Sequence, residues 1–411
     1  MTETDPERAA RGIEPVIATS SEPPRVLPSW PRFEQDEIAR VSAVLACGKV
    51  NAWTGGECRA FEEEYAEALG TKHAIALANG TLALELALEA LGVGAGDEVI
   101  VSPRSFIASA SAVVRVGARP VFADIDVDSG NLTPDSVRAV ISSRTKALIA
   151  VHLGGWPCRM DELMAVAEQH GLRLIEDCAQ AHGASYQGKP VGSWGHVAAF
   201  SFCQDKIITT GGEGGLVTTD DTELWSRMWS LKDHGKSYEA CFERHWPPGF
   251  RWLHESFGSN YRMTELQAAI GRLQLKKLPT WVAQRRANAD RLRTALEGSA
   301  IVRDPDVPPE IFHSRYRYYC HIVPERLAPG WSRDRILSEL QREGVPCFSG
   351  SCSEMYLEKA FADRDLAPPE RLKNAQLCGE TALAFLVHPT LTEEDLDWMS
   401  RRTRQVLSLA S

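Results

Sequence analysis

The sequence predicts an α/β fold in which a mainly parallel central sheet is flanked by helices and followed by a smaller C-terminal α+β domain. Up to about residue 220, short runs that are apolar on both faces alternate with helical patterns, as buried parallel strands and their crossover helices do. A long helical pattern begins after Thr264, and mixed β-like and helical segments follow from residue 300. The expected strands of the central sheet are residues 74–78, 99–102, 121–123, 147–151, 172–176 and 197–202.

The expected crossover helices have recognisable ends. Thr133 is a suitable N-cap and Pro134 fits the first helical position, where its missing N–H costs nothing. Another helix begins near Met160 and should stop at Gly171, since glycine readily adopts the left-handed conformation that ends helices. In the C-terminal part, residues 318–323 are predicted as a strand, and residues 336–342 and 393–407 as helices.

The length of 411 residues predicts two domains behind a tail. Residues 1–25 are rich in Pro, Glu, Ser and Thr without periodicity, which is typical of a flexible tail. Residues 26–265 are expected to form the large domain. Residues 266–411 should contain a bridging helix and the small domain.

Composition excludes several classes of function. The apolar runs are far shorter than the ~20 residues that a membrane span needs, and the N-terminus has no secretory pattern, so a cytoplasmic protein without membrane contact is expected. The net charge of −10 is a poor basis for binding nucleic acid. Ten cysteines without CxxC spacing argue against a zinc module, and no metal is expected at the pairs Cys178/His182 and Cys320/His321.

The most informative stretch surrounds Lys206, which lies between the end of a predicted strand and the glycine cluster 211–215. A lysine near a turn is usually only a solvated charge. At a strand terminus beside glycines, however, it could be desolvated, held neutral and made nucleophilic toward an aldehyde. Lys206 is therefore the candidate for a lysine that forms a Schiff base.

A second candidate, Asp177, directly follows a buried strand and precedes Lys206 by about one crossover unit. The alternative role for any single aspartate is a helix cap or a surface ion pair. Pyridoxal phosphate, however, needs a carboxylate against its ring nitrogen so that the ring can accept electrons. Both residues could converge at one edge of the sheet.

The segment Asn79-Gly80-Thr81 joins a predicted strand to a helix. This arrangement binds phosphate through free N–H groups and the helix dipole, although the same residues could be a simple turn and cap. Phe106 follows another strand and could stack on a flat ring, but a lone Phe more often belongs to a core.

Several motifs in order carry a resemblance that covers about residues 28–400. They are Asn79-Gly80-Thr81, Glu176-Asp177-x-x-Gln180-x-His182-Gly183, Phe200-Ser-Phe202 with Lys206, Gly211-Gly-Glu-Gly-Gly215 and Gly258-x-Asn260-Tyr-Arg262-Met263. This set resembles the DegT/DnrJ/EryC/StrS sugar aminotransferases. These are fold-type I enzymes that depend on pyridoxal phosphate.

The resemblance implies a role for each matched residue. Lys206 would hold the cofactor as a Schiff base and carry the proton in catalysis, and Asp177 would pair with the pyridine nitrogen. Gln180 would bond the ring hydroxyl and Phe106 would stack on the ring. The phosphate would be held by Gly80, Thr81 and Ser201, and by Asn260 from the partner in a homodimer with shared active sites.

The implied reaction has two halves. An amino donor, expected to be L-glutamate, leaves its nitrogen on the cofactor as pyridoxamine 5'-phosphate, and the nitrogen then passes to a keto group of a nucleotide-linked hexose for O-antigen, capsule or antibiotic sugars. Residues 346–356 depart from the His-Tyr-Pro-type segment common in the family. Trp53, His313 and Tyr318 are candidate substrate contacts, with core packing as the alternative for each.

Two other functions remain open from the sequence. The same chemistry could act on a keto-cyclitol or an aminated ring precursor. A non-catalytic regulatory protein of the same fold would show damage to the catalytic set, yet Lys206, Asp177 and Gln180 are all present.

Overall fold

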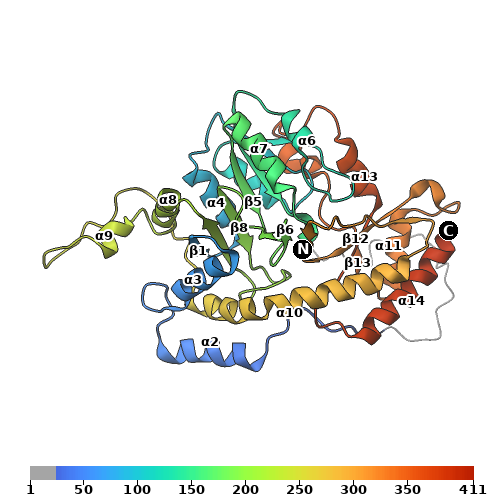
Figure 1. Ribbon diagram of the computed structural model, residues 1–411, viewed down its shortest axis with the longest axis horizontal. Coiled ribbons are helices and arrows are strands. Elements are labelled where there is room, and N and C mark those ends of the chain that lie inside the picture. Colours follow the sequence, from blue (N-terminus) through green and yellow to red (C-terminus); the bar gives the residue numbers. More distant parts are fainter. Residues whose placement is uncertain (1–24) are drawn as a thin grey trace.

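The computed structural model describes residues 25–411, and its centre is a seven-stranded sheet with the order β1-β9-β8-β5-β4-β2-β3 (Figure 1). The five strands from β8 to β3 are mutually parallel. All six predicted strands are present within one or two residues of the expected bounds. The strands are β1 (His73–Leu77), β2 (Glu98–Val101), β3 (Arg119–Phe122), β4 (Thr145–Val151), β5 (Arg173–Asp177), β8 (Val197–Ser201) and β9 (Gly215–Thr219).

Strand β9 was not predicted, and it runs antiparallel to both of its neighbours, β1 and β8. Residues 202–214 between β8 and β9 contain no helix, so the chain reverses instead of making the crossover that a parallel strand needs. Gly215 also passes very close to the turn after β1, because a Cβ there would lie 2.2 Å from the carbonyl oxygen of Asn79. The glycine cluster thus lets three strand ends approach one another.

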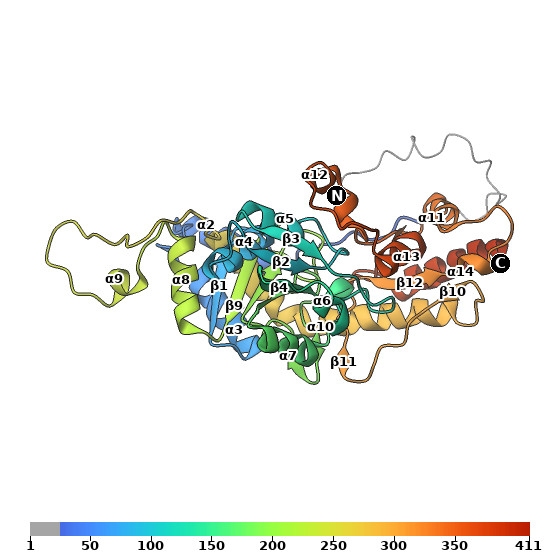
Figure 2. The ribbon, with the colours of Figure 1, turned by 90° about the horizontal axis from the view of Figure 1, so that it is seen from above.

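Helices cover both faces of this sheet (Figure 2). One face packs against α4, α5 and α8, and the other against α3 and α7. The predicted caps are confirmed: the Ser136 N–H donates to Thr133 at 3.1 Å, and Gly171 ends its helix with a φ of 65°. The helices are α3 (Glu57–Leu69), α4 (Gly80–Ala90), α5 (Ala108–Arg115), α6 (Pro134–Arg138), α7 (Met160–His170) and α8 (Thr222–Lys232).

The predicted bridging helix is α10 (Glu265–Leu296), which starts at a Thr264 cap. In Figure 1 it runs below the large sheet toward the smaller one. Helices α2 (Gln35–Cys47) and α3 pack against it, as does α14 (Glu393–Ala410). Helix α10 therefore contacts helices from both the N-terminal and the C-terminal parts of the chain.

The smaller sheet is antiparallel and has the order β10-β12-β14-β13. Its strands are β10 (Val302–Arg303), β12 (Tyr318–Ile322), β13 (Cys347–Phe348) and β14 (Ala382–Phe385), and α11 (Arg333–Arg342) and α14 complete its layer. A third sheet joins β11 (Ile311–Phe312) to β6 (Ser185–Tyr186) and β7 (Lys189–Pro190). The remaining helices are α9 (Tyr238–Phe242), α12 (Lys359–Ala362) and α13 (Lys373–Thr381).

The C-terminal part does not stay with its own sheet throughout. Tyr356 and Phe361 return to the core of the large sheet, where both rings pack against Phe122. No pattern in the sequence indicated this return, and contacts between the two parts of the chain therefore cross the predicted boundary at residue 265.

Most of the predicted N-terminal tail lies outside the described residues. Its last member, Arg25, is described and pairs with Asp395 at 2.5 Å and with Glu394 at 3.2 Å at the start of α14. Within residues 25–411, every helix is too short or too polar to cross a lipid bilayer.

Helix α3 depends on a carboxylate from α10. Glu265 accepts the Glu57 N–H at 2.5 Å and the Cys58 N–H at 3.1 Å, and it is buried. Glu265→Ala should lower the free energy of unfolding by about 1–3 kcal/mol, because two N–H groups lose their acceptor. Denaturant titration against the exposed control Glu297→Ala at the other end of α10 measures this. Equal losses in both variants would contradict the capping role.

Candidate active site

The predicted pair Asp177 and Lys206 converges at the carboxyl edge of the large sheet. Asp177 is the last residue of β5, and in the sheet it pairs with Ala199 of the parallel neighbour β8. Lys206 lies in the loop that follows β8. Because the carboxyl ends of adjacent parallel strands meet, both side chains face the same region, and Asp177 is one of the charges that act on Lys206.

The Asp177 carboxylate is buried and held from two sides. One oxygen, Oδ2, accepts the Ser109 hydroxyl at 2.7 Å, and Oδ1 accepts the Ala179 N–H at 3.1 Å. Ser109 in turn contacts the Ser105 hydroxyl at 2.8 Å. The serines fix the orientation of the acid. Nothing in the sequence marked Ser109, because its role depends on where α5 meets β5.

The Lys206 side chain is 13% exposed, and its Nζ lies 3.6 Å from Asp205 Oδ1 and 5.2 Å from the centre of the Tyr316 ring. Asp205 also accepts the Tyr316 hydroxyl and lies 3.5 Å from the Arg317 guanidinium. Lys206 is thus surrounded by a cluster that joins the two sheets.

This cluster opposes the effect of burial on the lysine. Burial alone would lower the pKa of Lys206 and keep it neutral. The nearby groups Tyr316, Asp205, Cys203 and Asp177 outweigh burial, and the pKa of Lys206 is raised.

Two of the residues predicted to hold a phosphate, Gly80 and Ser201, lie together where α4 starts beside the end of β8. A Cβ at Gly80 would lie 2.6 Å from the Ser201 Cβ, so only glycine lets α4 start this close to the end of β8. Asn79 caps α4 by accepting the Leu82 N–H at 3.0 Å. The N–H groups of Gly80 and Thr81 precede any intrahelical partner and remain available for an anion.

Gln180 and Phe106 lie on the wall of this region. Gln180 accepts the Gly154 N–H at 2.8 Å and donates to Ser351 Oγ at 3.3 Å, which connects the large domain to the loop after β13. Phe106 lies before α5 and is 62% exposed. Their roles toward a ring remain predictions.

The remaining candidates are dispersed. Asn260 lies in an exposed loop that pairs with Asp233, and Trp53 donates to the same Asp233 at 2.8 Å. His313 is buried at the seam between the sheets. Tyr318 is completely buried in the core of the small sheet, with its hydroxyl on Asp304 at 2.8 Å, so its assignment as a substrate contact is wrong.

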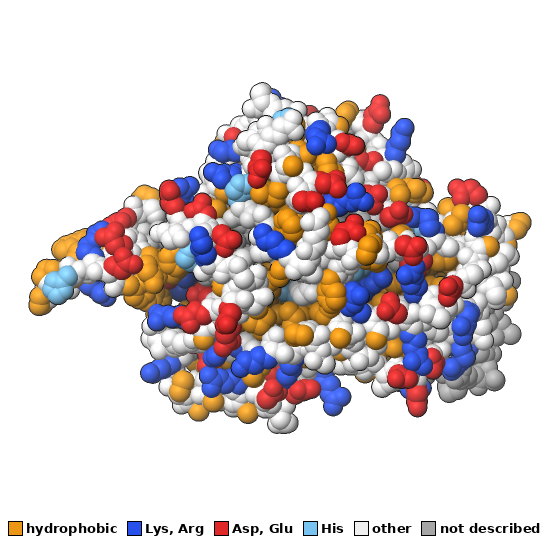
Figure 3. All heavy atoms as spheres, viewed as in Figure 1, with side chains coloured by type: hydrophobic (Ala, Val, Ile, Leu, Met, Phe, Trp, Pro, Cys, Tyr) orange, Lys and Arg blue, Asp and Glu red, His pale blue; other side chains and the backbone are white. Residues whose placement is uncertain are grey.

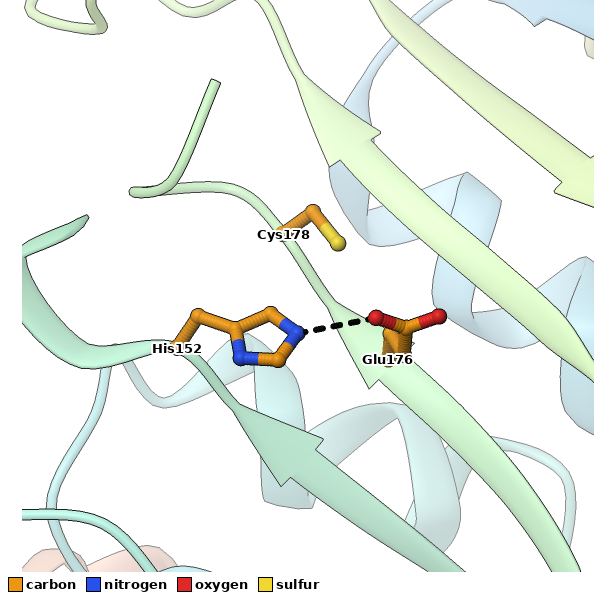
Figure 4. A group of neighbouring side chains, drawn as sticks. All are labelled: His152, Glu176 and Cys178. Carbon is orange, nitrogen blue, oxygen red and sulfur yellow. Dashed lines mark hydrogen bonds and ion pairs between the residues drawn. The ribbon is translucent and has the colours of Figure 1, made fainter. Parts of the chain in front are cut away.

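Glu176 is a buried residue next to Asp177 that the sequence marked only as part of a motif. It is completely buried and accepts the N–H groups of Gly192, Trp194 and Gly195, each at 2.8 Å. His152, at the end of β4, contacts it at 3.1 Å (Figure 4). Burial would raise the pKa of Glu176, but the bonds from His152 and the backbone lower it.

The grouping of His152, Glu176 and Cys178 in Figure 4 has the composition of a metal site but not its free ligand atoms. His152 Nδ1 accepts the Cys158 N–H at 3.0 Å, which leaves the proton on Nε2 for Glu176. Burial raises the pKa of the Cys178 thiol well above its usual range. A second acidic group, at the start of α2, already binds the Lys277 ammonium.

The residues at the sheet edge fit pyridoxal phosphate. The fit rests on the cradle that a Cβ at Gly80 would fill, on the buried and oriented carboxylate of Asp177, and on Lys206 in the loop after β8. Gly80, Thr81 and Ser201 would hold the phosphate, and Asp177 the ring nitrogen. When bound, the cofactor supplies an aldehyde for the amino group and a ring that accepts electrons.

An α/β sheet with this lysine, carboxylate and cradle at its carboxyl edge has the arrangement of an enzyme of the pyridoxal-phosphate type. The chain belongs to the DegT/DnrJ/EryC1/StrS aminotransferase family, whose model matches residues 31–402. This confirms the resemblance found in the sequence.

Relatives match over most of the chain. It is 54% identical to an aminotransferase from Psychrobacter cryohalolentis, with a TM-score of 0.92 and coverage of 93% of this chain and 99% of that one. GDP-perosamine synthase of Caulobacter vibrioides is 38% identical, with coverage of 94% and 100%. L-glutamine:2-deoxy-scyllo-inosose aminotransferase of Streptomyces kanamyceticus is 39% identical, with coverage of 78% and 76%.

The cluster around Lys206 makes a pH dependence testable. Asp205→Asn should lower the pKa of Lys206, because the carboxylate that favours the ammonium is gone. A lysine attacks an aldehyde only as the free amine. The pH at which pyridoxal phosphate attaches to the apo-protein at half its maximal rate should therefore fall with the pKa of Lys206. Stopped-flow absorbance across pH measures this.

The matched control is Asp135→Asn, an exposed aspartate in α6. Its pH profile should coincide with that of the wild type. An unshifted profile for Asp205→Asn would show that Asp205 does not set the charge of the lysine.

Proposed function

We propose that the protein transfers an amino group from an amino acid, with L-glutamate as donor, to a keto group of a nucleotide-linked hexose, using pyridoxal 5'-phosphate. The observation that carries the proposal is that Lys206 and the buried, oriented Asp177 lie at the carboxyl ends of two adjacent parallel strands, β8 and β5, and that Ser201 at the end of the same β8 lies against Gly80. Family membership and the GDP-perosamine synthase relative support the substrate class.

Each residue at the site would have a separate role in the reaction. Ser109 keeps Asp177 aimed, and Asp177 as a carboxylate keeps the ring nitrogen protonated. Lys206 holds and returns the proton at the reacting carbon, since it is the base that the loop after β8 supplies. Gln180, fixed by Gly154 and Ser351, would orient the ring hydroxyl.

A second candidate substrate is a keto-cyclitol. It is supported by the Streptomyces relative, which is named for a scyllo-inosose and for L-glutamine as donor. A panel of nucleotide keto-sugars and keto-cyclitols, each with L-glutamate or L-glutamine, separates the two by specificity constant.

We also propose a homodimer with shared active sites, in which Asn260 reaches the phosphate held by its partner. An arm around α9 projects from the large sheet and carries hydrophobic side chains (Figures 1 and 3). Phe250, Trp252 and Phe257 on this arm are largely exposed in the single chain. A second copy would cover this apolar surface and bring Asn260 near its site.

Lys206→Ala should abolish the visible absorbance band of lysine-bound cofactor and reduce amino transfer by at least about a thousandfold, because no other group at the site can replace the amine. The control is Lys359→Ala, whose side chain is 89% exposed in α12. Absorbance and transfer assays measure both. Transfer near the wild-type rate in Lys206→Ala would remove the proposed role of this lysine.

Shared sites predict complementation between two inactive variants. Lys206→Ala lacks the amine, and Asn260→Asp places a carboxylate where the partner's cofactor phosphate is expected. After co-refolding in equal amounts, half of the dimers should be mixed and contain one intact site each, which gives about a quarter of wild-type activity. Activity no greater than that of the separate variants would argue against shared sites.

A further inference from the structure

Arg317, which directly precedes β12, lies on the side of the small sheet that faces the active site. Tyr318 points into the core of the small sheet, and successive residues of an extended segment point to opposite sides, so Arg317 and Tyr319 share the other face. The Tyr319 hydroxyl accepts the Ser351 N–H at 3.1 Å, and Ser351 contacts Gln180 on the wall of the active site. The same face therefore presents Arg317 to the site.

The Arg317 guanidinium uses little of its hydrogen-bonding capacity inside the protein. Within residues 25–411 it forms one ion pair, with Asp205 Oδ2 at 3.5 Å, and it lies 4.9 Å from the centre of the Tyr316 ring. A charge-assisted bond to a carboxylate is about 2.7–2.9 Å long, so this contact is loose. The side chain is 16% exposed, so water reaches it. A guanidinium has five N–H donors, and several remain available for a second carboxylate.

A second arginine, Arg285 of α10, adds positive charge near this contact. It is 2% exposed, and among the described residues only its Nη1 has a hydrogen-bond partner, the Tyr316 carbonyl oxygen at 3.3 Å. Burial and the nearby charge of Arg317 lower the pKa of Arg285 to about 9. The carboxylate that acts on both arginines is Asp205. When Lys206 is a free amine, two positive charges face one negative charge, so this part of the site favours one further anion.

The position of Arg317 limits what that anion can be. Asp205 lies 3.6 Å from Lys206 Nζ through Oδ1 and 3.5 Å from Arg317 through Oδ2, so a single carboxylate group spans the space between the two side chains. In an α-amino acid the carboxylate is bonded to the carbon that carries the amino group. In a nucleotide-linked keto-hexose, part of the sugar ring separates the diphosphate from the keto carbon. The amino donor is thus the substrate that brings an anion this close to Lys206.

We propose that Arg317 binds the α-carboxylate of the amino donor and so selects an α-amino acid for the reaction. This inference rests on the proposed function and adds to it the group that recognises the donor. The acceptor brings no such carboxylate to the reacting carbon, so Arg317 acts in the first half of the reaction and not in the second. Its planar fork can donate two parallel N–H bonds to one carboxylate, which a lysine cannot do.

The two half-reactions can be measured separately in Arg317→Gln. Loss of the visible band on mixing the pyridoxal phosphate form with L-glutamate reports the first half, and mixing the pyridoxamine phosphate form with a keto-sugar nucleotide reports the second. The specificity constant of the first half should fall about 30-fold, because a hydrogen-bonded charge pair is lost, while that of the second should stay near the wild-type value. Arg138→Gln, an exposed control in α6, should leave both unchanged. Equal losses in both halves, or none in the first, would overturn the proposal.

Changes in the donor identify which carboxylate Arg317 binds. The α-amide of L-glutamate lacks the α-carboxylate, whereas L-glutamine lacks the carboxylate of the side chain. In the wild type the α-amide should react about 30-fold more slowly than L-glutamate, and in Arg317→Gln the two should react alike, because the partner of the carboxylate is gone. The same ratio in both proteins would contradict the assignment, as would a ratio that changes for L-glutamine instead.

Calorimetry with α-methyl-L-glutamate, whose α-carbon carries no proton, gives donor affinity without amino transfer. The wild-type holoenzyme should bind it about 30-fold more tightly than Arg317→Gln. Arg317→Lys should be intermediate, since it keeps the charge but not the fork. These measurements use no acceptor, so failure of every keto-sugar and keto-cyclitol to accept nitrogen would contradict the proposed function and leave this test intact. Equal affinity in the three proteins, or no binding by the wild type, would overturn the role of Arg317.

Discussion

The buried carboxylate of Glu176 is the interaction on which the active site depends. It binds His152 at the end of β4 and three N–H groups of the loop before β8, while it belongs to β5 itself. Three neighbouring strand ends are thus fixed by one side chain. Successive residues of a strand point to opposite faces, so Glu176 anchors one face while Asp177 reaches the other. Glu176 fixes the strand, and Ser109 then orients the Asp177 carboxylate that the strand presents.

The sequence predicted the parts of the fold that local pattern controls. The apolar runs gave the parallel strands, and the Thr133, Thr264 and Gly171 signals gave helix ends that the structure confirms. It did not predict that β9 reverses, because direction depends on the loop that holds Lys206 and not on the strand itself. Tyr318 shows the same limit. The local sequence pattern of a strand residue in the small domain is the same whether its side chain faces a substrate or the core.

The residues of the candidate site could likewise be predicted from the sequence only in part. Lys206 and Asp177 could be found because each follows a buried strand, and strand order then brings them together. Ser109, Tyr316 and Arg317 could not, because they come from α5 and from the approach to β12, and their contacts exist only after the domains pack. Asp205 had a visible signal, its position beside the lysine, but its effect on charge depends on partners from the other sheet.

Charge therefore couples the small sheet to the catalytic lysine. Asp205 is held by Tyr316 and Arg317, so movement of the small sheet would change the groups around Lys206. An aldehyde attaches only to the free amine of Lys206. Attachment is therefore favoured when the Asp205 carboxylate binds Arg317 and Tyr316 rather than stabilising the Lys206 ammonium. Burial alone would favour the neutral amine of Lys206, but the protonation of the lysine would then not depend on how the two sheets pack together. Here the contacts of Asp205 with Tyr316 and Arg317 join the two sheets and also affect the protonation of Lys206.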